Sequence, residues 1–441
     1  MTTTTTFRPS RKMAPEHKPR RHLLLQLTVF ALPFSYVPHE FGVRNLSVTP
    51  AVVALVLLVG ARYGALGRRL GAMDTASILL ASWIGVRILI LGPLEDAAPD
   101  ILDVVSSVGA VIAGIVMFRL ARRHELRPAF KSGLRLSLLF LVAIAGYQSL
   151  AGLGRLQALG YTTGFYYFTF EGAFRPFGTF LSPTVFGAYL AMIGVAVTLL
   201  HRGWAAWAWF AVTAAGLLMT ETRAAWIAAA AALVVVFFHR PGRARMRAVV
   251  WLVPAGIVAL IFALTNLDLV GTIFDRLSGL LSDATTSRTA RLSLWEGVLT
   301  VIQQSPIIGF GQTSFVDMLR PVAGDAAAFG HAHENYLQVL YLYGGIGLVL
   351  FLIVLVLAYR GIRVTLKQSP DSQFAYAALG GLVAFAVDSL FETTWLSLSV
   401  VTLLFLVVGL GYSDKIGYAT RDGLIPGGSS LPSHSIGTLS S

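Results

Sequence analysis

The sequence contains no cysteine, which excludes disulfides, thiolate nucleophiles and cysteine-ligated zinc or iron–sulfur sites. Charged residues are also scarce, at 13% of the 441 residues, whereas a soluble domain usually carries about 25%. Hydrophobic residues make up 55% of the chain and form many runs close to the roughly 20 residues that a spanning helix needs. The composition therefore indicates a polytopic membrane protein.

The apolar runs are long and continuous, and they lack the ten-residue alternation of a membrane β-barrel. Backbone groups in lipid must be satisfied within the protein, which leaves helices as the spanning elements. We predict an all-α fold with about twelve transmembrane helices. The expected spans are 23–38, 48–65, 75–93, 101–120, 134–152, 182–200, 204–220, 223–239, 248–265, 337–359, 373–390 and 395–412.

Alternate loops between these spans are rich in arginine and lysine. The positive-inside rule makes these loops cytoplasmic, and the even number of spans then makes both termini cytoplasmic. The same rule accounts for the net charge of +12, so nucleic-acid binding is not expected. The basic loop residues are Arg68, Arg69, Arg122, Arg123, Arg127, Lys131, Arg202, Arg240, Arg243, Arg245, Arg247, Arg360, Arg363 and Lys367.

The domain organisation follows from this topology. Residues 1–22 form a basic cytoplasmic tail and residues 413–441 a tail rich in Gly, Ser and Pro, and we expect both to be disordered. Residues 23–412 form the transmembrane domain. Residues 266–336 form a large extracytoplasmic loop inserted in it, and the stretch 268–283 has the apolar spacing of an amphipathic helix at the membrane surface.

A second helix is predicted in this loop, from about residue 289 to residue 304. Arg288, Arg291 and Trp295 would share one of its faces, because they are three and four residues apart. Pro306 and the Gly309–Gly311 turn would end it.

Four arginines lie on the expected outer side, where the positive-inside rule predicts few. Interfacial snorkelling or pairing with a nearby glutamate is one explanation for each of them. Binding of an anion is the other, because guanidinium groups grip phosphate oxygens and stay charged. If they converge on one outward cavity, they would suit a diphosphate. The four are Arg175, Arg223, Arg288 and Arg291.

Two histidines, His331 and His333, lie just before the span that begins at residue 337. Imidazole is partly neutral near pH 7 and can therefore accept a proton as a general base. A loop histidine bonded to backbone is the plain alternative. A metal site of His331, His333 and Glu334 is a weaker one, because it offers few ligands.

Charged residues inside apolar spans are costly and need a partner or a polar cavity. Arg87 and Asp388 are in this position. Glu392 follows the eleventh span, where a surface position is compatible with its charge.

Four stretches together resemble the superfamily of O-antigen ligases and O-antigen or exopolysaccharide polymerases. RPFGTFLSPTVFGAYL is similar to its Arg-x-x-Gly segment, and TETRAAW to its short Ser/Thr-Arg turn. RLSLWEGVLTVIQQSPIIGFGQTSF resembles its Arg-x-x-x-Trp helix and the Gly-x-Gly turn after it. HAHENYLQVLYLYGGIGLVLFL resembles its His-Asn-x-x-Leu entry to a late helix. The order and spacing of the stretches carry the resemblance, and the first 150 residues match only as apolar helices.

The resemblance implies roles for individual residues. His333 would activate an acceptor hydroxyl as a base. Arg175, Arg223 and Arg291 would bind the diphosphate of a polyprenyl-linked glycan, with Arg288 as a lesser candidate. His331, Glu334, Asn335 and Trp295 would support the site. The sequence departs from the family at Glu334, where Asn or Ser is usual, although His333 keeps its four-residue spacing to Leu337.

The activity so implied is a metal-independent glycosyltransferase of the GT-C type in the bacterial cytoplasmic membrane, with its site at the outer face and no cofactor. Its partners would be a polyprenyl-diphosphate-linked glycan donor, a lipid or glycan acceptor, and membrane lipids. A transporter or flippase of a lipid-linked glycan is the alternative. Against it, transporters usually show repeats and a binding site at the midplane of the bilayer. The residues do not distinguish a ligase from a polymerase.

Overall fold

A computed structural model describes the chain in segments, and it is helical almost throughout. The exception is one antiparallel hairpin of two-residue strands, β1 (Thr169–Phe170) and β2 (Ala173–Phe174). The described residues are 22–34, 49–67, 69–91, 101–158, 169–170, 173–180, 182–243, 245–246, 286–311, 314–395 and 397–412.

The described helices and helical turns follow one another along the chain. In order they are α1 (Leu23–Ala31), α2 (Thr49–Arg62), α3 (Ala72–Val86), the π-turn η3 (Arg87–Leu91), α5 (Ile101–Ala121), η4 (His124–Leu126), α6 (Arg127–Ala158), α7 (Pro183–Leu199), α8 (Trp204–Thr220), α9 (Arg223–His239), α12 (Thr286–Ile302), α13 (Phe315–Ala323), η6 (Gly324–Phe329), α14 (Asn335–Gln368), α15 (Gln373–Asp388) and α16 (Leu398–Gly411).

The predicted all-helical membrane fold is confirmed, whereas the count of twelve spans is not. Three helical stretches are long and apolar enough to cross a membrane: Ala72–Leu91, His124–Leu156 and Asn335–Gln368. Seven shorter apolar helices, of 10 to 17 residues, accompany them in the described part of the chain. The predicted span 248–265 and the predicted amphipathic helix 268–283 lie outside the described residues, as do both tails except for His22.

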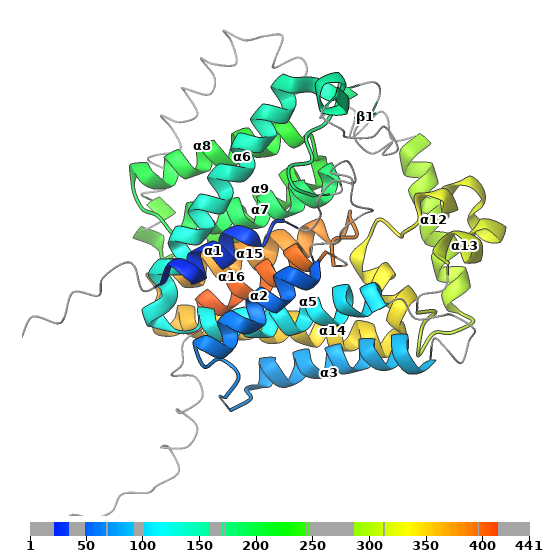
Figure 1. Ribbon diagram of the computed structural model, residues 1–441, viewed down its shortest axis with the longest axis horizontal. Helices are drawn as coiled ribbons and strands as arrows, with labels where there is room; N and C mark the ends of the chain where they lie inside the picture. Colours follow the sequence, from blue (N-terminus) through cyan, green and yellow to red (C-terminus); the bar gives the residue numbers. More distant parts are fainter. Residues whose placement is uncertain are drawn as a thin grey trace, which may run out of the picture.

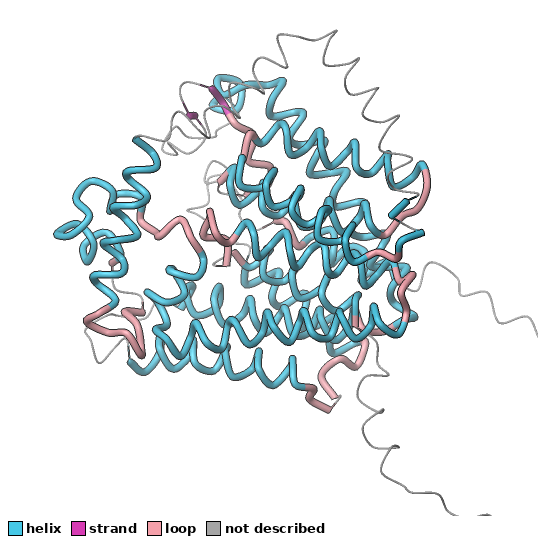
Figure 2. Tube along the Cα trace, turned by 180° about the vertical axis from the view of Figure 1, so that it is seen from behind, coloured by secondary structure: helices cyan, strands magenta, loops and turns pink. Residues whose placement is uncertain are grey.

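The helices form one bundle, and α12 and α13 stand beside one end of it (Figure 1). The view from behind shows the same arrangement (Figure 2). Every residue of α16 is buried, and this helix packs against α5 and α15. Glycines permit the close approach, since a Cβ on Gly114 would lie 2.8 Å from the Phe405 ring.

The direction of α15 decides which helix ends meet. Tyr376, near its start, donates a hydrogen bond to the carbonyl of His239 at the end of α9 (3.3 Å). Gly380 packs on Leu199, at the end of α7. Helix α15 is therefore antiparallel to both, and its last residue reaches the end of the bundle where α7 and α9 begin. Helix α14 also begins there, because the Asn335 amide donates to the Ser389 carbonyl (2.8 Å). We call this the site end.

The opposite end collects the loops that were predicted to be basic. Arg127 donates to the carbonyl of Tyr412 (2.9 Å), and Lys131 to the carbonyl of Leu200 (2.7 Å). Arg202 donates to the carbonyl of Asp371 (3.1 Å). Leu200 and Tyr412 are the C-cap residues of α7 and α16, where positive charge is favoured, and Asp371 lies in the turn between α14 and α15. We call this the basic end.

Helix α14 is broken at Gly344, which has φ 65° and ψ −170°. The segment 306–311 docks against the break. The amides of Phe310 and Gly311 donate to the carbonyls of Tyr341 and Leu342 (2.7 and 2.8 Å), and the Gly345 amide donates to the Pro306 carbonyl (2.8 Å). A break in a membrane helix is tolerated when the freed backbone groups are satisfied in this way. The predicted Gly309–Gly311 turn thus joins α12 firmly to α14.

Arg87 supports this docked turn from η3. The residue is fully buried, and its Nη2 donates to the Gly309 carbonyl at 2.9 Å. Trp83, one turn earlier, donates from Nε1 to the Tyr343 carbonyl (2.8 Å). The charge of Arg87 was expected to need a partner within the membrane, and the Gly309 carbonyl on the docked turn is such a partner.

Substitution of Gly309 by alanine should destabilise the protein strongly. Gly309 has φ 73°, and an added Cβ would lie 2.7 Å from the Tyr341 carbonyl oxygen, which is backbone and cannot move aside. We expect the free energy of unfolding to fall by more than about 3 kcal/mol. The measurement is the thermal unfolding midpoint of the purified protein in detergent.

Gly203→Ala is the matched control. Gly203 has φ 59°, but an added Cβ would meet nothing within 4 Å. The Gly203→Ala change should cost only the strain of a side chain at this backbone conformation (φ 59°, ψ −143°), about 1–3 kcal/mol. Equal losses for both variants would show that the docked turn adds no steric constraint.

Candidate functional site

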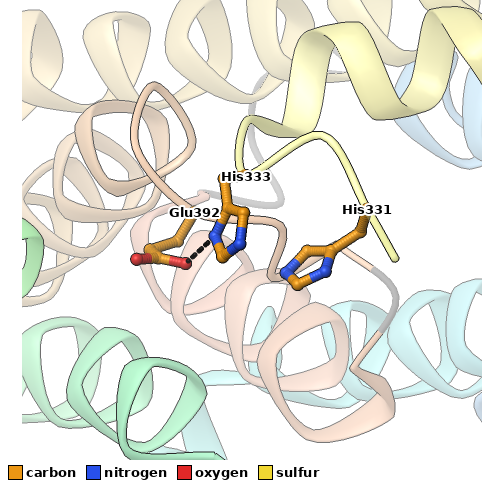
Figure 3. A group of neighbouring side chains, drawn as sticks. All are labelled: His331, His333 and Glu392. Carbon is orange, nitrogen blue, oxygen red and sulfur yellow. Dashed lines mark hydrogen bonds and ion pairs between the residues drawn. The ribbon is translucent and has the colours of Figure 1, made fainter. Parts of the chain in front are cut away.

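His333 lies in the loop between η6 and α14, and its ring is held by an acidic side chain from another segment. Nδ1 of His333 is 3.3 Å from Oε2 of Glu392, which lies between α15 and α16 (Figure 3). The His333 side chain is 13% exposed and the Glu392 side chain 6%. His333 also has φ 50°, an uncommon conformation for a residue with a side chain. The fold therefore keeps this imidazole in one defined place.

Glu392 also contacts the predicted diphosphate-binding helix. Its other oxygen, Oε1, is 3.6 Å from Nη2 of Arg291 on α12, whose side chain remains 34% exposed. The surface position considered for Glu392 is wrong, because the residue is buried between a histidine and an arginine. One carboxylate thus joins the predicted base to a predicted anion-binding residue.

The charge state of Glu392 follows from these contacts. Burial alone would raise the pKa of this carboxyl. The hydrogen bond from His333 and the electrostatic interactions with His333, Arg291 and His331 outweigh burial and bring its pKa below the ordinary value. Glu392 is therefore a carboxylate at neutral pH and can only accept, which requires Nδ1 of His333 to carry the proton.

Trp295 fixes α12 to the histidine loop. Its Nε1 donates to the carbonyl of Ala332 (2.9 Å), while the amide of Ala332 donates to Oε1 of Gln338 on α14 (2.8 Å). Arg291 contacts Glu392 and Trp295 contacts Ala332, so the two side chains share one face of α12, as predicted. For Arg288, the structure describes the backbone within α12 and not the side chain.

Glu334 caps the start of α14. Its carboxylate accepts from the amides of Tyr336 (3.1 Å) and Leu337, and its own amide donates to Oγ1 of Thr393 (3.2 Å). Burial raises the pKa of this carboxyl, and the two amide hydrogen bonds oppose the rise. An oxygen at the N-cap is what the free amides of a first turn need, so Glu334 can fill a position where Asn or Ser is usual. This role makes the considered metal ligand set with Glu334 unsuitable.

Asn335 holds the segment that carries Glu392. It is fully buried, and its Nδ2 donates to Oγ of Ser389 (2.7 Å) and to Oγ1 of Thr394 (3.1 Å). Its Oδ1 accepts from the amides of Thr394 and Trp395 (2.9 and 2.8 Å). Asn335 uses all of its donors and acceptors within the protein, so it positions Glu392 and leaves no group for a substrate.

Arg175 follows β2, and its side chain contacts the turn before α9, at the same end of the bundle. Its Nε donates to the carbonyl of Thr220 (3.1 Å), and its Nη2 to Oγ1 of Thr222 (2.9 Å). Thr222 in turn donates to the carbonyl of Pro183, at the start of α7 (3.1 Å). Arg223 is the next residue, half-buried, and the first of α9. Arg175 therefore shapes the turn that presents Arg223.

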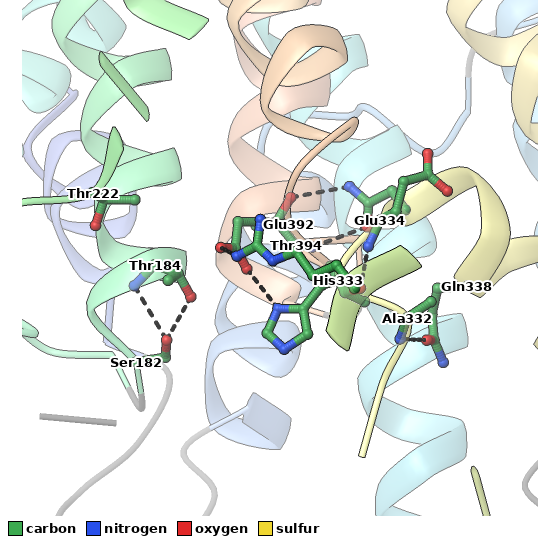
Figure 4. A network of polar contacts seen from close by, with 12 residues as sticks. Ser182, Thr184, Thr222, Ala332, His333, Glu334, Gln338, Glu392 and Thr394 are labelled. Carbon is green, nitrogen blue, oxygen red and sulfur yellow. Dashed lines mark hydrogen bonds and ion pairs between the residues drawn. The ribbon is translucent and has the colours of Figure 1, made fainter. Parts of the chain in front are cut away.

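The His333–Glu392–Arg291 group and the turn that carries Arg223 both lie at the site end of the bundle. Figure 4 shows the contacts around His333 and Glu392 on one side, and the hydroxyl side chains of Ser182, Thr184 and Thr222 on the other. Ser182 and Thr222 lie at the starts of α7 and α9, and Glu392 follows α15, which packs against both helices. Asp388, the last residue of α15, is also buried there.

The geometry offers a defined chemical capability. Because the Glu392 carboxylate accepts from Nδ1, the neutral imidazole of His333 carries its lone pair on Nε2. Such a ring can take a proton on Nε2. The guanidinium of Arg291 is partly exposed beside it, and it stays charged at any relevant pH. The site thus pairs a proton acceptor with a fixed positive charge.

Sequence reasoning missed Glu392 as a site residue. Its weak signal was a carboxylate directly after a span, on the side of the membrane expected to hold the arginines. Four residues earlier stands Asp388, and two acids so placed at the end of one apolar helix call for cations nearby. The cations come from α12 and from the histidine loop, about 100 and 60 residues away in the sequence.

Comparison with known families was made by sequence. Residues 207–352 match the family model described as O-antigen ligase. The match runs from α8 into α14 and includes Arg223, Arg291 and His333. Among curated proteins, no match was found. The matched family and the apolar helices together indicate a bacterial inner-membrane protein.

Proposed function

From the O-antigen ligase match, which supports the O-antigen ligase/polymerase superfamily, we propose that this protein transfers a glycan from a polyprenyl-diphosphate donor to an acceptor hydroxyl. The observation that carries the proposal is the His333–Glu392–Arg291 group, in which one buried carboxylate contacts both the base and a partly exposed arginine. In the reaction, the acceptor oxygen bonds to the anomeric carbon of the donor. The bond from that carbon to the diphosphate oxygen breaks.

His333 takes the proton of the acceptor hydroxyl. The hydrogen bond from Nδ1 to Glu392 selects the tautomer with its lone pair on Nε2, and the carboxylate stabilises the imidazolium that forms. The base is then regenerated when the proton leaves to solvent. Trp295 and Gln338 hold the loop through Ala332, so the ring is pre-positioned and does not have to be ordered during the reaction.

Arginines stabilise the leaving diphosphate. Negative charge grows on this group as the glycosidic bond breaks, and preorganised cations favour the transition state over the ground state. Arg291 and Arg223 offer their guanidinium groups to the diphosphate, and Arg288 is a further candidate on α12. Arg175 holds the turn before Arg223 and contributes at least that support. Because cations from the chain supply the charge, we propose a metal-independent reaction.

The site is proposed to face the extracytoplasmic side. The basic end of the bundle carries the arginines and lysines that the positive-inside rule assigns to the cytoplasm, and the site lies at the opposite end. The polyprenyl tail stays in the bilayer, so a site at the membrane boundary is suited to such a donor. We propose that the loop 266–336 is extracytoplasmic and both termini are cytoplasmic, as expected from the sequence, and the proposed reaction covers both a ligase and a polymerase.

Reconstituted vesicles test the function. We expect the purified protein, given a lipid-linked glycan and an acceptor glycolipid, to yield a product whose mass is the sum of glycan and acceptor, with free polyprenyl diphosphate as the second product. Mass spectrometry of the extracted lipids measures both. Movement of the donor across the bilayer without any change in mass would instead support the transporter alternative.

Arg291→Ala provides the matched variant for this assay. Loss of one preorganised cation costs about 3 kcal/mol of transition-state stabilisation, or roughly a hundredfold in rate. Arg320→Ala, on the neighbouring helix α13, removes an exposed arginine and serves as the control. Equal rates for the Arg291 variant and the wild type would remove Arg291 from the diphosphate site.

A further inference from the structure

The two histidines and the buried glutamate form a compact set of ligands. One ligand atom from each of His331, His333 and Glu392 can be chosen so that all three lie within 4.8 Å of one another. The rings of His331 and His333 have centroids 4.1 Å apart, and Figure 3 shows His333 between the Glu392 carboxylate and His331. The sequence suggests Glu334 as the third ligand, but Glu334 caps the start of α14. Glu392 takes its place in the set.

The spacing suits a small transition-metal ion. Two ligand atoms that are each about 2.0–2.1 Å from a tetrahedral Zn²⁺ lie about 3.3–3.4 Å apart. Nδ1 of His333 and Oε2 of Glu392 are 3.3 Å apart. The ligand atom of the half-buried His331 lies within 4.8 Å of those of His333 and Glu392, so a shift of roughly 1.5 Å would bring it to the separation of ligands on one Zn²⁺ ion. Imidazole nitrogen and carboxylate oxygen are ligands that Zn²⁺ accepts readily.

Arg291 limits the affinity of such a site without blocking it. Its guanidinium contacts Oε1 of Glu392, while His333 contacts Oε2. The two oxygens are thus divided between the arginine and the imidazole side, where the metal would bind. A nearby positive charge weakens binding of a cation, so the site is suited to reversible occupation.

We propose that His331, His333 and Glu392 form an inhibitory site for a divalent transition-metal ion of the zinc class. The inhibitory part rests on the proposed function, whereas binding of the metal does not. When Nδ1 of His333 binds the ion, the single proton of the neutral ring moves from Nδ1 to Nε2, so Nε2 no longer has a free lone pair. If Nε2 is the ligand, its lone pair is occupied by the metal. In both cases the imidazole cannot accept the proton of the acceptor hydroxyl.

The test measures binding of Zn²⁺ alone to the full-length protein in detergent by isothermal titration calorimetry, with no glycan present. We expect one ion per chain. His331→Gln and Glu392→Gln should each weaken binding by at least about tenfold. The matched control is His124→Gln, because His124 lies at the basic end beside Arg127, far from the three ligands in the fold. Mg²⁺ should not compete, because it prefers oxygen ligands.

Glycan transfer is then measured with increasing Zn²⁺, and each variant is normalised to its own rate without metal. The wild type and His124→Gln should lose activity over the range in which the ion binds, and His331→Gln should need at least about tenfold more metal. Absence of saturable binding, or equal affinity in wild type and His331→Gln, would overturn the metal site. Tight binding without inhibition would instead contradict the role of His333 as base.

Discussion

His333→Ala should lower the rate of glycan transfer by about 10²–10⁴-fold, the range that a positioned general base contributes. The variant retains the backbone of the histidine loop, which is held through Ala332 by Trp295 and Gln338. The expected loss is therefore in chemistry and not in folding. The measurement is the initial rate of product formation from a lipid-linked donor, at equal amounts of folded protein.

The control for this variant is His124→Ala. His124 lies before α6, where its ring contacts Arg127 at the basic end, and it is remote from Glu392. It should transfer glycan at the wild-type rate. Full activity of purified His333→Ala would remove this histidine from the mechanism and leave proton transfer to water.

Glu392→Gln should have the second large effect. The side-chain amide of glutamine has the shape of the carboxylate but no charge. It therefore neither selects the tautomer of His333 nor stabilises the imidazolium. A comparable Asp→Asn change in a serine protease triad lowers kcat by about 10⁴. We expect a loss of about 10²–10⁴-fold here, mainly in kcat, because the partly exposed guanidinium of Arg291 still binds the donor. Steady-state kinetics with varied donor measure the split between kcat and KM.

Glu296→Gln is the matched control, because Glu296 is an exposed acid on the same helix as Arg291. The Glu296→Gln variant should change neither kcat nor KM by more than a small factor. A Glu392→Gln variant that raised KM and kept kcat would show that Glu392 acts through Arg291 on donor binding and not through His333 on proton transfer.

Much of the fold was predictable because the membrane imposes a simple rule on composition. Long apolar runs with basic loops predict helices and their ends, and α7, α8, α9 and α16 lie where the spans were expected. The helix of Arg291 and Trp295 was predicted from spacing and is observed as α12 (Thr286–Ile302). The number of spans was not confirmed, since several apolar helices are shorter than a full crossing and the stretch 248–265 is not described.

The candidate site was predictable where a residue was unusual for its place. Arginines on the outer side and a histidine at the mouth of a span are conspicuous in an apolar chain, and Arg291 and His333 meet through Glu392 as part of one group. Arg175 was expected to bind diphosphate, whereas the structure shows its guanidinium on the Thr220–Thr222 turn. A local count of charges cannot tell whether a guanidinium contacts backbone or faces a substrate.

The sequence by itself determined that this is a helical membrane protein, which end of each span carries positive charge, and which cations and imidazoles are available for chemistry. These follow from composition and from neighbours along the chain. Only the tertiary structure decided that Glu392 orients His333, that Asn335 clamps the Glu392 segment, and that the 306–311 turn docks into the break of α14 with Arg87 beneath it. Each of these joins segments far apart in the sequence, and burial of polar groups in an apolar interior selects such partners only once the helices have packed.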